Sequence, residues 1–394
     1  MIDLVSSVLA ASVGFGQSVL SYALPFIFVL SIVVFFHELG HFLVARWCGV
    51  AVEVFSIGFG KALISWNDKH GTRWQVAWLP LGGYVKFVGD ANAASAPGSG
   101  ESRETVSAEE AKRRADAGHF HFKSVGQRSL VVAAGPVANF LLAIVIFAAT
   151  FAIVGEERIP PKVTAVSEDS AAAQAGFVPG DLILTINGRK IESFGEMQEI
   201  VSVSAGSTLA VEVARDGRVV TLTATPQSVE QKDRLGNVYR LGRLGIASEV
   251  DPSEIEYVHY DPVSAIAKGV ERTGFMIERT LSFLGRLILG REDASQLSGP
   301  LGIAKVSGDV AQQLGFLALL NLAAVLSVSI GLINLFPIPM LDGGHLLYYG
   351  YEAVRGRPLG ERAQEFGFRV GIALVLSLMI FATWNDLVKL QIFG

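Results

Sequence analysis

Four stretches of this 394-residue chain are long and apolar enough to cross a membrane as helices. They cover roughly residues 23–47, 130–154, a part of 310–341, and 367–384. A helix needs about 20 apolar residues to span the hydrocarbon core of a bilayer. The second and third stretches contain no charged residue, and the shorter fourth begins beside Arg369, whose side chain can snorkel to the interface. The pattern predicts a polytopic α-helical membrane protein with four transmembrane helices.

Between the first two stretches, residues 51–90 alternate apolar and polar positions like short β-strands. Gly58, Gly60, Gly82 and Gly83 interrupt the alternation. We therefore expect a β-hairpin or small sheet, either a soluble cytoplasmic hairpin or a membrane-reentrant β region. Non-helical backbone at membrane depth is tolerated only where protein buries it or where it lines a wet cavity.

Residues 156–228 have the pattern of a small soluble α+β domain with strand-like alternation. Ser170 and Gly176 are typical helix caps, and Asn187-Gly188 is typical of a hairpin turn. The segment 170–188, with its Ala-Gly-Phe-x-Pro-Gly-Asp-x-Ile core, resembles a bacterial PDZ domain. The resemblance implies either capture of a peptide or an ectodomain at a sheet edge, or a size filter that excludes bulky substrates.

The remaining segments connect these parts. Residues 91–125 are expected to form a flexible cytoplasmic linker with a short helix near 108–115, and an amphipathic helix over 262–289 is expected at the membrane surface or against the PDZ domain. The predicted segments are therefore the first transmembrane helix in 1–50, the β region in 51–90, the linker in 91–125, the second helix in 126–155, the PDZ domain in 156–228, a post-PDZ region in 229–308, the third helix in 309–344, a cytoplasmic loop in 345–366, and the fourth helix with a C-terminal tail in 367–394.

The distribution of basic residues predicts the orientation. No Lys or Arg precedes Arg46, whereas both the loop after the first helix and the loop before the fourth are rich in them. By the positive-inside rule these two loops are cytoplasmic, and both termini and the PDZ domain face the periplasm. No cleavable signal peptide is evident, so the first apolar stretch is expected to remain as an anchor.

Composition excludes several classes of protein. With 51% hydrophobic and 18% charged residues, and a mean hydropathy of +0.44, the chain is too apolar for an ordinary soluble enzyme. The net charge of −5 comes without a basic block, so no nucleic-acid partner is expected. The single cysteine, Cys48, rules out an intramolecular disulfide framework and a Cys-rich zinc finger.

The candidate chemistry lies in His37-Glu38-Leu39-Gly40-His41, inside the first apolar stretch. Positions i and i+4 share one face of a helix, so both imidazoles can reach one metal ion, with Glu38 as a general base beside it. Polar and ionisable groups at this depth are costly, and they indicate a functional site.

A catalytic zinc site needs a third protein ligand and one open position. Asp342 is the best candidate, because it ends the uncharged third stretch after Pro337 and Pro339, which cannot continue a regular helix. The charge rule places this end on the cytoplasmic side, at the level of His37 and His41.

Together these features resemble the site-2 proteases, a family of intramembrane zinc metalloproteases, and in particular their bacterial RseP-like (regulator of sigma-E protease) branch. One departure is that the best-known members of that branch carry two tandem PDZ domains, whereas this chain shows one, which bears on any gating by a paired arrangement. The matching motifs are His37–His41, Pro80-Leu81-Gly82-Gly83-Tyr84-Val85-Lys86, Gly135-Pro136-x-x-Asn139, Ser298-Gly299-Pro300-x-Gly302-Ile303-Ala304, and Asn334-x-x-Pro337-x-Pro339-x-x-Asp342-Gly343.

The resemblance implies cleavage of single-span membrane proteins within the bacterial inner membrane, with anti-sigma factors and remnant signal peptides as substrates. It also implies a role for individual residues: His37, His41 and Asp342 as Zn²⁺ ligands, Glu38 as base and then acid, Asn334 as a holder of the substrate backbone, Gly82, Gly83 and Tyr84 in a strand layer that pairs with an unwound substrate helix, and Gly135 and Asn139 as packing contacts of the second helix.

Two other classes of function compete with this interpretation. A non-catalytic membrane PDZ scaffold or chaperone would bind substrates without cutting them, but it would need none of His37, Glu38, His41 and Asp342. A metal transporter or sensor would need polar residues along two or more helices, and the second stretch offers only Asn139 and small hydroxyls.

Overall fold

The computed structural model describes residues 2–90, 106–232, 238–248, 256–290 and 294–390. These residues form two compact units, which we describe separately. The first consists of Met1–Phe147, Arg272–Ile277 and Ser298–Leu387, and the second of Ala148–Glu271, Glu278–Leu297 and Val388–Gly394. Residues 91–105 of the expected linker lie outside the described residues.

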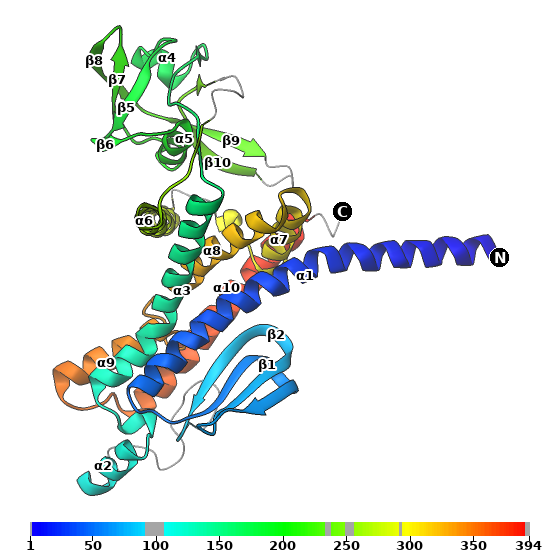
Figure 1. Ribbon diagram of the computed structural model, residues 1–394, viewed down its shortest axis with the longest axis vertical. Helices are drawn as coiled ribbons and strands as arrows, with labels where there is room; N and C mark the ends of the chain where they lie inside the picture. Colours follow the sequence, from blue (N-terminus) through cyan, green and yellow to red (C-terminus); the bar gives the residue numbers. More distant parts are fainter. Residues whose placement is uncertain (1, 91–105, 233–237, 249–255, 291–293, 391–394) are drawn as a thin grey trace. The chain divides into compact units, whose positions relative to one another are not determined.

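The first unit is mainly helical (Figure 1). Among the described residues, four helical stretches are long and apolar enough to cross a membrane, as predicted: Leu20–Trp47, Val125–Ile153, Gly315–Asn334 and Arg362–Lys389. The helices that form this unit or enter it are α1 (Ile2–Trp47), α2 (Ala108–Asp116), α3 (Val125–Ile153), the middle of α6 (Pro262–Ile288), α7 (Pro300–Gln313), α8 (Gly315–Asn334), α9 (Asp342–Arg355) and α10 (Glu361–Lys389).

Small residues let α1, α3 and α8 approach closely. A Cβ atom added at Gly40 of α1 would lie 2.3 Å from the carbonyl oxygen of Ala134 on α3, and one added at Gly331 of α8 would lie 3.1 Å from Cβ of Asn139. Close backbone approach at small residues is a common way for membrane helices to associate. It brings the His-bearing turn of α1 directly against α3.

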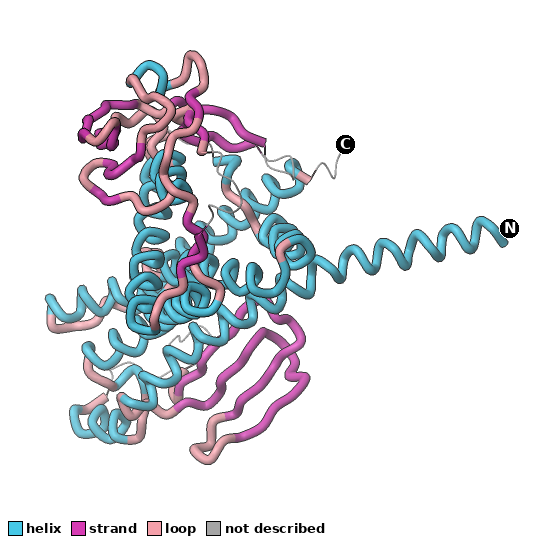
Figure 2. The backbone as a smooth tube through the Cα atoms, turned by 45° about the horizontal axis from the view of Figure 1, so that its top comes forward, coloured by secondary structure: helices cyan, strands magenta, loops and turns pink. Residues whose placement is uncertain are grey.

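Two long strands, β1 (Val52–Asn67) and β2 (Arg73–Phe87), form the β region predicted for residues 51–90. They bend so that Phe55 pairs with Val85 on one side and with Trp74 on the other. Figure 2 shows these strands in magenta beside α1. Phe55 is fully buried and stacks on Trp74, which fixes the inner face of the sheet against α1.

The segment before α3 differs from the expected flexible linker. Besides α2, which confirms the short helix expected near 108–115, it contains a 3₁₀ turn at Phe120–Phe122. Both phenylalanines of this turn are buried, and Phe120 stacks on Phe87 of β2. The average composition of the segment does not predict this buried turn, because only two large apolar side chains hold it against the rest of the unit.

Residues 309–344, expected to hold the third transmembrane helix, contain more than one helix. They include the end of α7, the whole of α8, a non-helical stretch over 335–341 and the first residues of α9. Asp342 therefore begins a new helix after the proline-containing stretch, instead of ending the third span.

The second unit is built around a four-stranded sheet in the order β6-β5-β7-β8. Ser170 caps α4 by accepting a hydrogen bond from the amide of Ala173, Gly176 ends that helix in the left-handed region, and Asn187-Gly188 turns between β5 and β6, as predicted. Its elements are β3 (Glu156–Arg158), β4 (Ala165–Val166), α4 (Ala171–Ala175), β5 (Leu182–Ile186), β6 (Arg189–Lys190), α5 (Phe194–Ser202), β7 (Leu209–Arg215), β8 (Arg218–Ala224), β9 (Gln227–Lys232), β10 (Val238–Arg243), β11 (Ile246–Ala247), β12 (Glu256–Val258), most of α6 (Pro262–Ile288) and a 3₁₀ turn at Ala294–Gln296.

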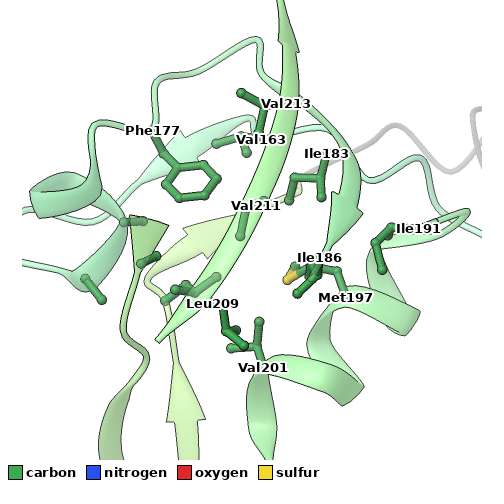
Figure 3. Packing of buried hydrophobic residues seen from close by; sticks show 14 of the residues in the cluster. Val163, Phe177, Ile183, Ile186, Ile191, Met197, Val201, Leu209, Val211 and Val213 are labelled. Carbon is green, nitrogen blue, oxygen red and sulfur yellow. The ribbon is translucent and has the colours of Figure 1, made fainter. Parts of the chain in front are cut away.

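The core of this unit is apolar and continuous (Figure 3). Val211 and Val213 of β7 and Ile183 of β5 are almost fully buried against Phe177 and Met197. The core also includes Leu244, and β11 pairs with β4, so the unit extends beyond the boundary expected at residue 228. The long helix α6 confirms the amphipathic helix predicted over 262–289.

Candidate metal centre and active site

His37 and His41 lie one turn apart on α1, with their Nε2 atoms 3.2 Å from each other. Asp342, about 300 residues away in sequence, reaches the same point: its Oδ2 lies 3.2 Å from Nε2 of His37 and its Oδ1 lies 3.6 Å from Nε2 of His41. Potential ligand atoms of the three residues all lie within 4.8 Å of one another. The structure thus brings together the three side chains that spacing and topology predict as a metal site.

A tight backbone turn positions Asp342. The stretch over 335–341 folds back so closely that a Cβ atom at Gly343 would lie 2.2 Å from the carbonyl oxygen of Leu335, and one at Gly344 would lie 2.4 Å from that of Ile338. Met340 has a positive φ of 100°, which is unusual for a residue with a side chain. Strained backbone of this kind persists where the surrounding structure enforces it, often at functional sites.

The donor set fits a zinc ion. Two imidazoles and one carboxylate are one of the three-ligand sets found in catalytic zinc sites, which leave a fourth position for water or substrate. Oδ2 of Asp342 is buried and makes no hydrogen bond among the described residues. The carboxylate faces Nε2 of His37 and Nε2 of His41, so a cation at this point would meet all three side chains.

Glu38 faces the same pocket as the three ligands. The pocket has a volume of about 210 Å³. Gly83 of β2 packs so closely here that a Cβ atom on it would lie 3.0 Å from Cγ of Glu38. The lining residues are His37, Glu38, His41, Gly83, Tyr84, Val85, Phe87, Phe120, Val131, Val132, Asn334, Met340, Asp342, His345 and Tyr349.

The residues expected to bind substrate are only partly brought together. Asn334, Gly83 and Tyr84 line the pocket, and the side chain of Asn334 donates to the carbonyl of Ile330 at 3.1 Å. Gly82 does not line it, because its position faces Phe59: a Cβ there would lie 2.5 Å from that ring, at a backbone φ of 138°. Gly82 therefore supports the bend of β2, while its neighbours face the pocket.

The second helix, α3, does more than the packing expected of Gly135 and Asn139. The backbone carbonyl of Val131 accepts a hydrogen bond from Nδ1 of His41 at 2.8 Å. A Cβ atom at Gly135 would lie 2.2 Å from Nε2 of His41, so the absence of a side chain makes room for the imidazole. The side-chain amide of Asn139 lies 3.2 Å from Nδ1 of His37. Both ligand rings therefore contact one face of α3.

Sequence reasoning missed several residues of the pocket. His345 and Tyr349 follow Asp342 at spacings of three and seven, which places them on the same face of α9 as the aspartate, and that spacing was a usable signal. Phe120 reaches the pocket from the short turn before α3. No local pattern predicted Phe120, since its place depends on tertiary packing.

Comparisons with known proteins agree with this chemistry. The sequence profile of peptidase family M50 matches residues 25–378. A protein of Mesorhizobium japonicum whose name describes it as a zinc metalloprotease is 50% identical over 363 residues, covering 92% of this chain and 97% of that protein.

Two further relatives are similar over nearly their full lengths. Metalloprotease MmpA of Caulobacter vibrioides is 44% identical over 383 residues, covering 93% of this chain and 95% of that protein. Regulator of sigma-E protease RseP of Escherichia coli is 32% identical over 462 aligned positions, covering 93% of this chain and 98% of that protein.

Fold, site and comparisons define a membrane protein of the zinc metalloprotease class. The chain belongs to peptidase family M50, the site-2 proteases.

Proposed function

We propose that this zinc metalloprotease is an intramembrane endopeptidase that cleaves the transmembrane segments of single-span proteins. The observation that carries the proposal is the position of the site: His37, Glu38 and His41 lie within a helix that is long and apolar enough to span a bilayer. Asp342 completes the ligand set from the start of α9. A non-catalytic scaffold has no use for this assembly.

His37, His41 and Asp342 would hold the zinc ion. When bound, zinc polarises the scissile carbonyl and lowers the pKa of a coordinated water molecule toward neutrality. Glu38 lies beside the ligands in the pocket, where its carboxylate can accept a proton from the attacking water and pass it to the leaving amine. Asn334 also lines the pocket, and in this proposal it holds the substrate backbone.

The edge of the β1–β2 sheet supplies a surface for the substrate. Gly83, Tyr84 and Val85 line the pocket, and Val85 pairs with Phe55 on its inner side. Helical hydrogen bonds shield the peptide bonds of a transmembrane segment, so the segment must unwind before it is cut. An unwound strand can pair with an exposed sheet edge, which exposes its backbone to Glu38 and the metal.

The substrate class and location follow from the same reasoning. The basic loops after the first span and before the fourth favour a site that opens to the cytoplasm. The protein would then lie in a bacterial inner membrane, with its second unit and both termini on the periplasmic side. RseP is named as a regulator of sigma-E protease, which supports proteins that control sigma factors, such as anti-sigma factors, as substrates. Remnant signal peptides are a second substrate class that we propose, on the resemblance of the motifs to the family alone. The second unit would act as a PDZ domain that binds a peptide or ectodomain, or as a size filter.

The test is cleavage of a tagged single-span protein by the full chain in liposomes. We expect cleavage by the wild type, its loss on chelation, its return with added zinc, and a loss of at least about 100-fold in Glu38→Gln. Glu365→Gln, which alters an exposed carboxylate on α10, is the matched control and should cleave normally. Equal cleavage by Glu38→Gln would exclude the assigned base. Substrate that co-purifies uncut with every variant would favour the scaffold.

A further inference from the structure

The two candidate ligand histidines face the metal position with the same ring atom. Nε2 of His37 and Nε2 of His41 are the atoms closest to the carboxylate of Asp342, at 3.2 and 3.6 Å. A neutral imidazole that gives the Nε2 lone pair to a metal carries its proton on Nδ1. That Nδ1–H needs an acceptor, and the acceptor fixes both the tautomer and the orientation of the ring.

His41 has such an acceptor in the backbone of α3. Its Nδ1 lies 2.8 Å from the carbonyl oxygen of Val131, which can only accept a hydrogen bond. The contact therefore requires the proton on Nδ1 and leaves Nε2 free for the metal. Pro136, which lacks an amide hydrogen, removes the helical hydrogen bond to the carbonyl of Val132, the residue next to Val131.

His37 meets a side chain instead. Its Nδ1 lies 3.2 Å from the amide nitrogen of Asn139, two turns further along the same face of α3. Asn139 is fully buried, and its Oδ1 makes no hydrogen bond among the described residues. In this orientation an NH₂ group faces the nitrogen that must itself carry a proton when the metal is bound.

A half-turn of the Asn139 amide resolves this conflict. The oxygen and nitrogen of an asparagine amide occupy nearly the same volume and exchange places by rotation about the terminal torsion. After the exchange, Oδ1 faces Nδ1–H of His37. The Asn139 backbone makes a separate contact with α8: its carbonyl accepts a hydrogen bond from the buried hydroxyl of Ser327 at 2.8 Å, and the exchange of the side-chain atoms leaves this contact unchanged.

We propose that Asn139 is a positioning residue for the metal centre: its side-chain oxygen accepts the Nδ1–H of His37 and so presents Nε2 of that ring to zinc. The inference rests on the proposed role of His37 as a ligand. With Val131 serving His41 and Gly135 leaving space for both rings, one face of α3 orients the pair. Asn139 thus acts through His37 and makes no contact with substrate.

The experiment compares zinc affinity in the full-length detergent-purified protein, by competition with a chromophoric chelator. The variants are Asn139→Leu, which keeps the approximate volume without an acceptor, and Asn139→Asp, which restores one. Ser327→Ala is the matched control, because it removes the α3–α8 hydrogen bond and leaves the amide intact. The visible spectrum of the cobalt-substituted protein reports the ligand geometry.

We expect Asn139→Leu to bind zinc roughly 10- to 100-fold more weakly and to shift the cobalt spectrum. Asn139→Asp and Ser327→Ala should stay within about threefold of the wild type. The inference is overturned if Asn139→Leu binds as the wild type does, or if Asn139→Asp loses as much affinity as Asn139→Leu. If the wild type itself takes up no zinc, the proposed metal site fails as well, which separates the two failures.

Discussion

Arg128 at the start of α3 and Glu352 on α9 form an ion pair with a nitrogen–oxygen distance of 2.7 Å, and each side chain is only 7% exposed. The guanidinium also lies over the ring of Tyr349, 4.7 Å from its centroid. The pair joins the helix that contacts both ligand histidines to the helix that begins with Asp342. The ion pair therefore helps to fix the distance between α3 and α9 beside the metal site.

We expect removal of one partner of this pair to destabilise the first unit strongly. A buried charge without its partner costs about 3–5 kcal/mol, so Glu352→Gln should lower the midpoint of thermal unfolding in detergent and reduce bound zinc. Replacing both partners with apolar residues of similar size, Arg128→Met with Glu352→Leu, should recover much of the stability. An equal loss in the single and the double variant would show that the pair is not the source of the effect.

Gly135 tests the space that α3 leaves for the ligands. A methyl group at this position would lie 2.2 Å from Nε2 of His41 and 2.9 Å from Cε1 of His37, so the rings or the helix must move. We expect Gly135→Ala to weaken zinc binding by roughly 10- to 100-fold, as for other changes that misorient ligands. Gly126→Ala on the same helix is the control, because a Cβ there meets no atom within 4 Å. Normal zinc affinity in Gly135→Ala would contradict the close packing of α3 on the ligands.

The metal ligands could be predicted from the sequence because each depends on a local pattern. His37 and His41 need only helical spacing, and Asp342 needs only the order of apolar spans and flanking charges. The functions of Gly135 and Asn139 depend instead on how closely α1 meets α3. That distance is set by Gly40 against Ala134, two residues far apart in the chain, and no pattern along a single segment contains it.

Two local signals were present but outweighed. The start of α7 carries Pro300 directly after Gly299, a proline at the first helical position, whereas the post-PDZ region predicted over 229–308 contains only the amphipathic helix. Phe120 and Phe122 fall in the segment predicted to be a flexible linker, although both are buried. In each case a few side chains determine the local structure, and the average composition of the longer segment does not reveal them.

We expect the turn between β1 and β2 to lose stability at acid pH because of Asp68. Burial acts to raise its pKa, but hydrogen bonds from Trp74 and from the amides of His70 and Thr72, together with Arg46, lower the pKa to about 2. In the unfolded chain an aspartate has a pKa of about 3.9. The ionised form therefore stabilises the turn above about pH 4, and this contribution is lost as the pH falls toward 2.

Hydrogen–deuterium exchange of peptides that cover the turn between β1 and β2 measures whether the turn loses stability at acid pH. In the wild type, protection of the turn should fall between about pH 4 and 2 after correction for intrinsic exchange rates. Asp68→Asn should be less protected already at neutral pH and should change little on acidification. Asp116→Asn, at an exposed carboxylate on α2, is the control. A wild-type profile that stays flat through this range would contradict the role given to Asp68.

Asp386 of α10 accepts two hydrogen bonds from backbone amides at the N-terminus of α7. Its Oδ1 accepts a hydrogen bond from the amide of Gly299 at 3.0 Å, its Oδ2 accepts one from the amide of Gly302 at 2.8 Å, and the residue is 1% exposed. Both glycines are required by this contact, since a Cβ on either would lie 2.8 Å from a carboxylate oxygen of Asp386. The contact gives the Ser298–Ala304 motif a physical reason.

We expect Asp386→Ala to destabilise the first unit by about 2–6 kcal/mol, because a buried amide (Gly299) and a partly buried one (Gly302) lose their acceptor and each unpaired group costs about 1–3 kcal/mol. Asp386→Asn keeps one acceptor oxygen and should lose less. Glu365→Gln, which breaks an exposed pair with Arg369 on the same helix, should change stability by under about 1 kcal/mol. Thermal unfolding in detergent gives the order of the three variants.

The loss of Asp386 should also affect catalysis. A single residue, Leu314, separates α7 from α8, and α8 ends at Asn334 in the pocket. A displaced α7 should therefore lower activity more than it lowers zinc content. Equal losses of activity and zinc would instead place the effect of Asp386 on the metal site itself.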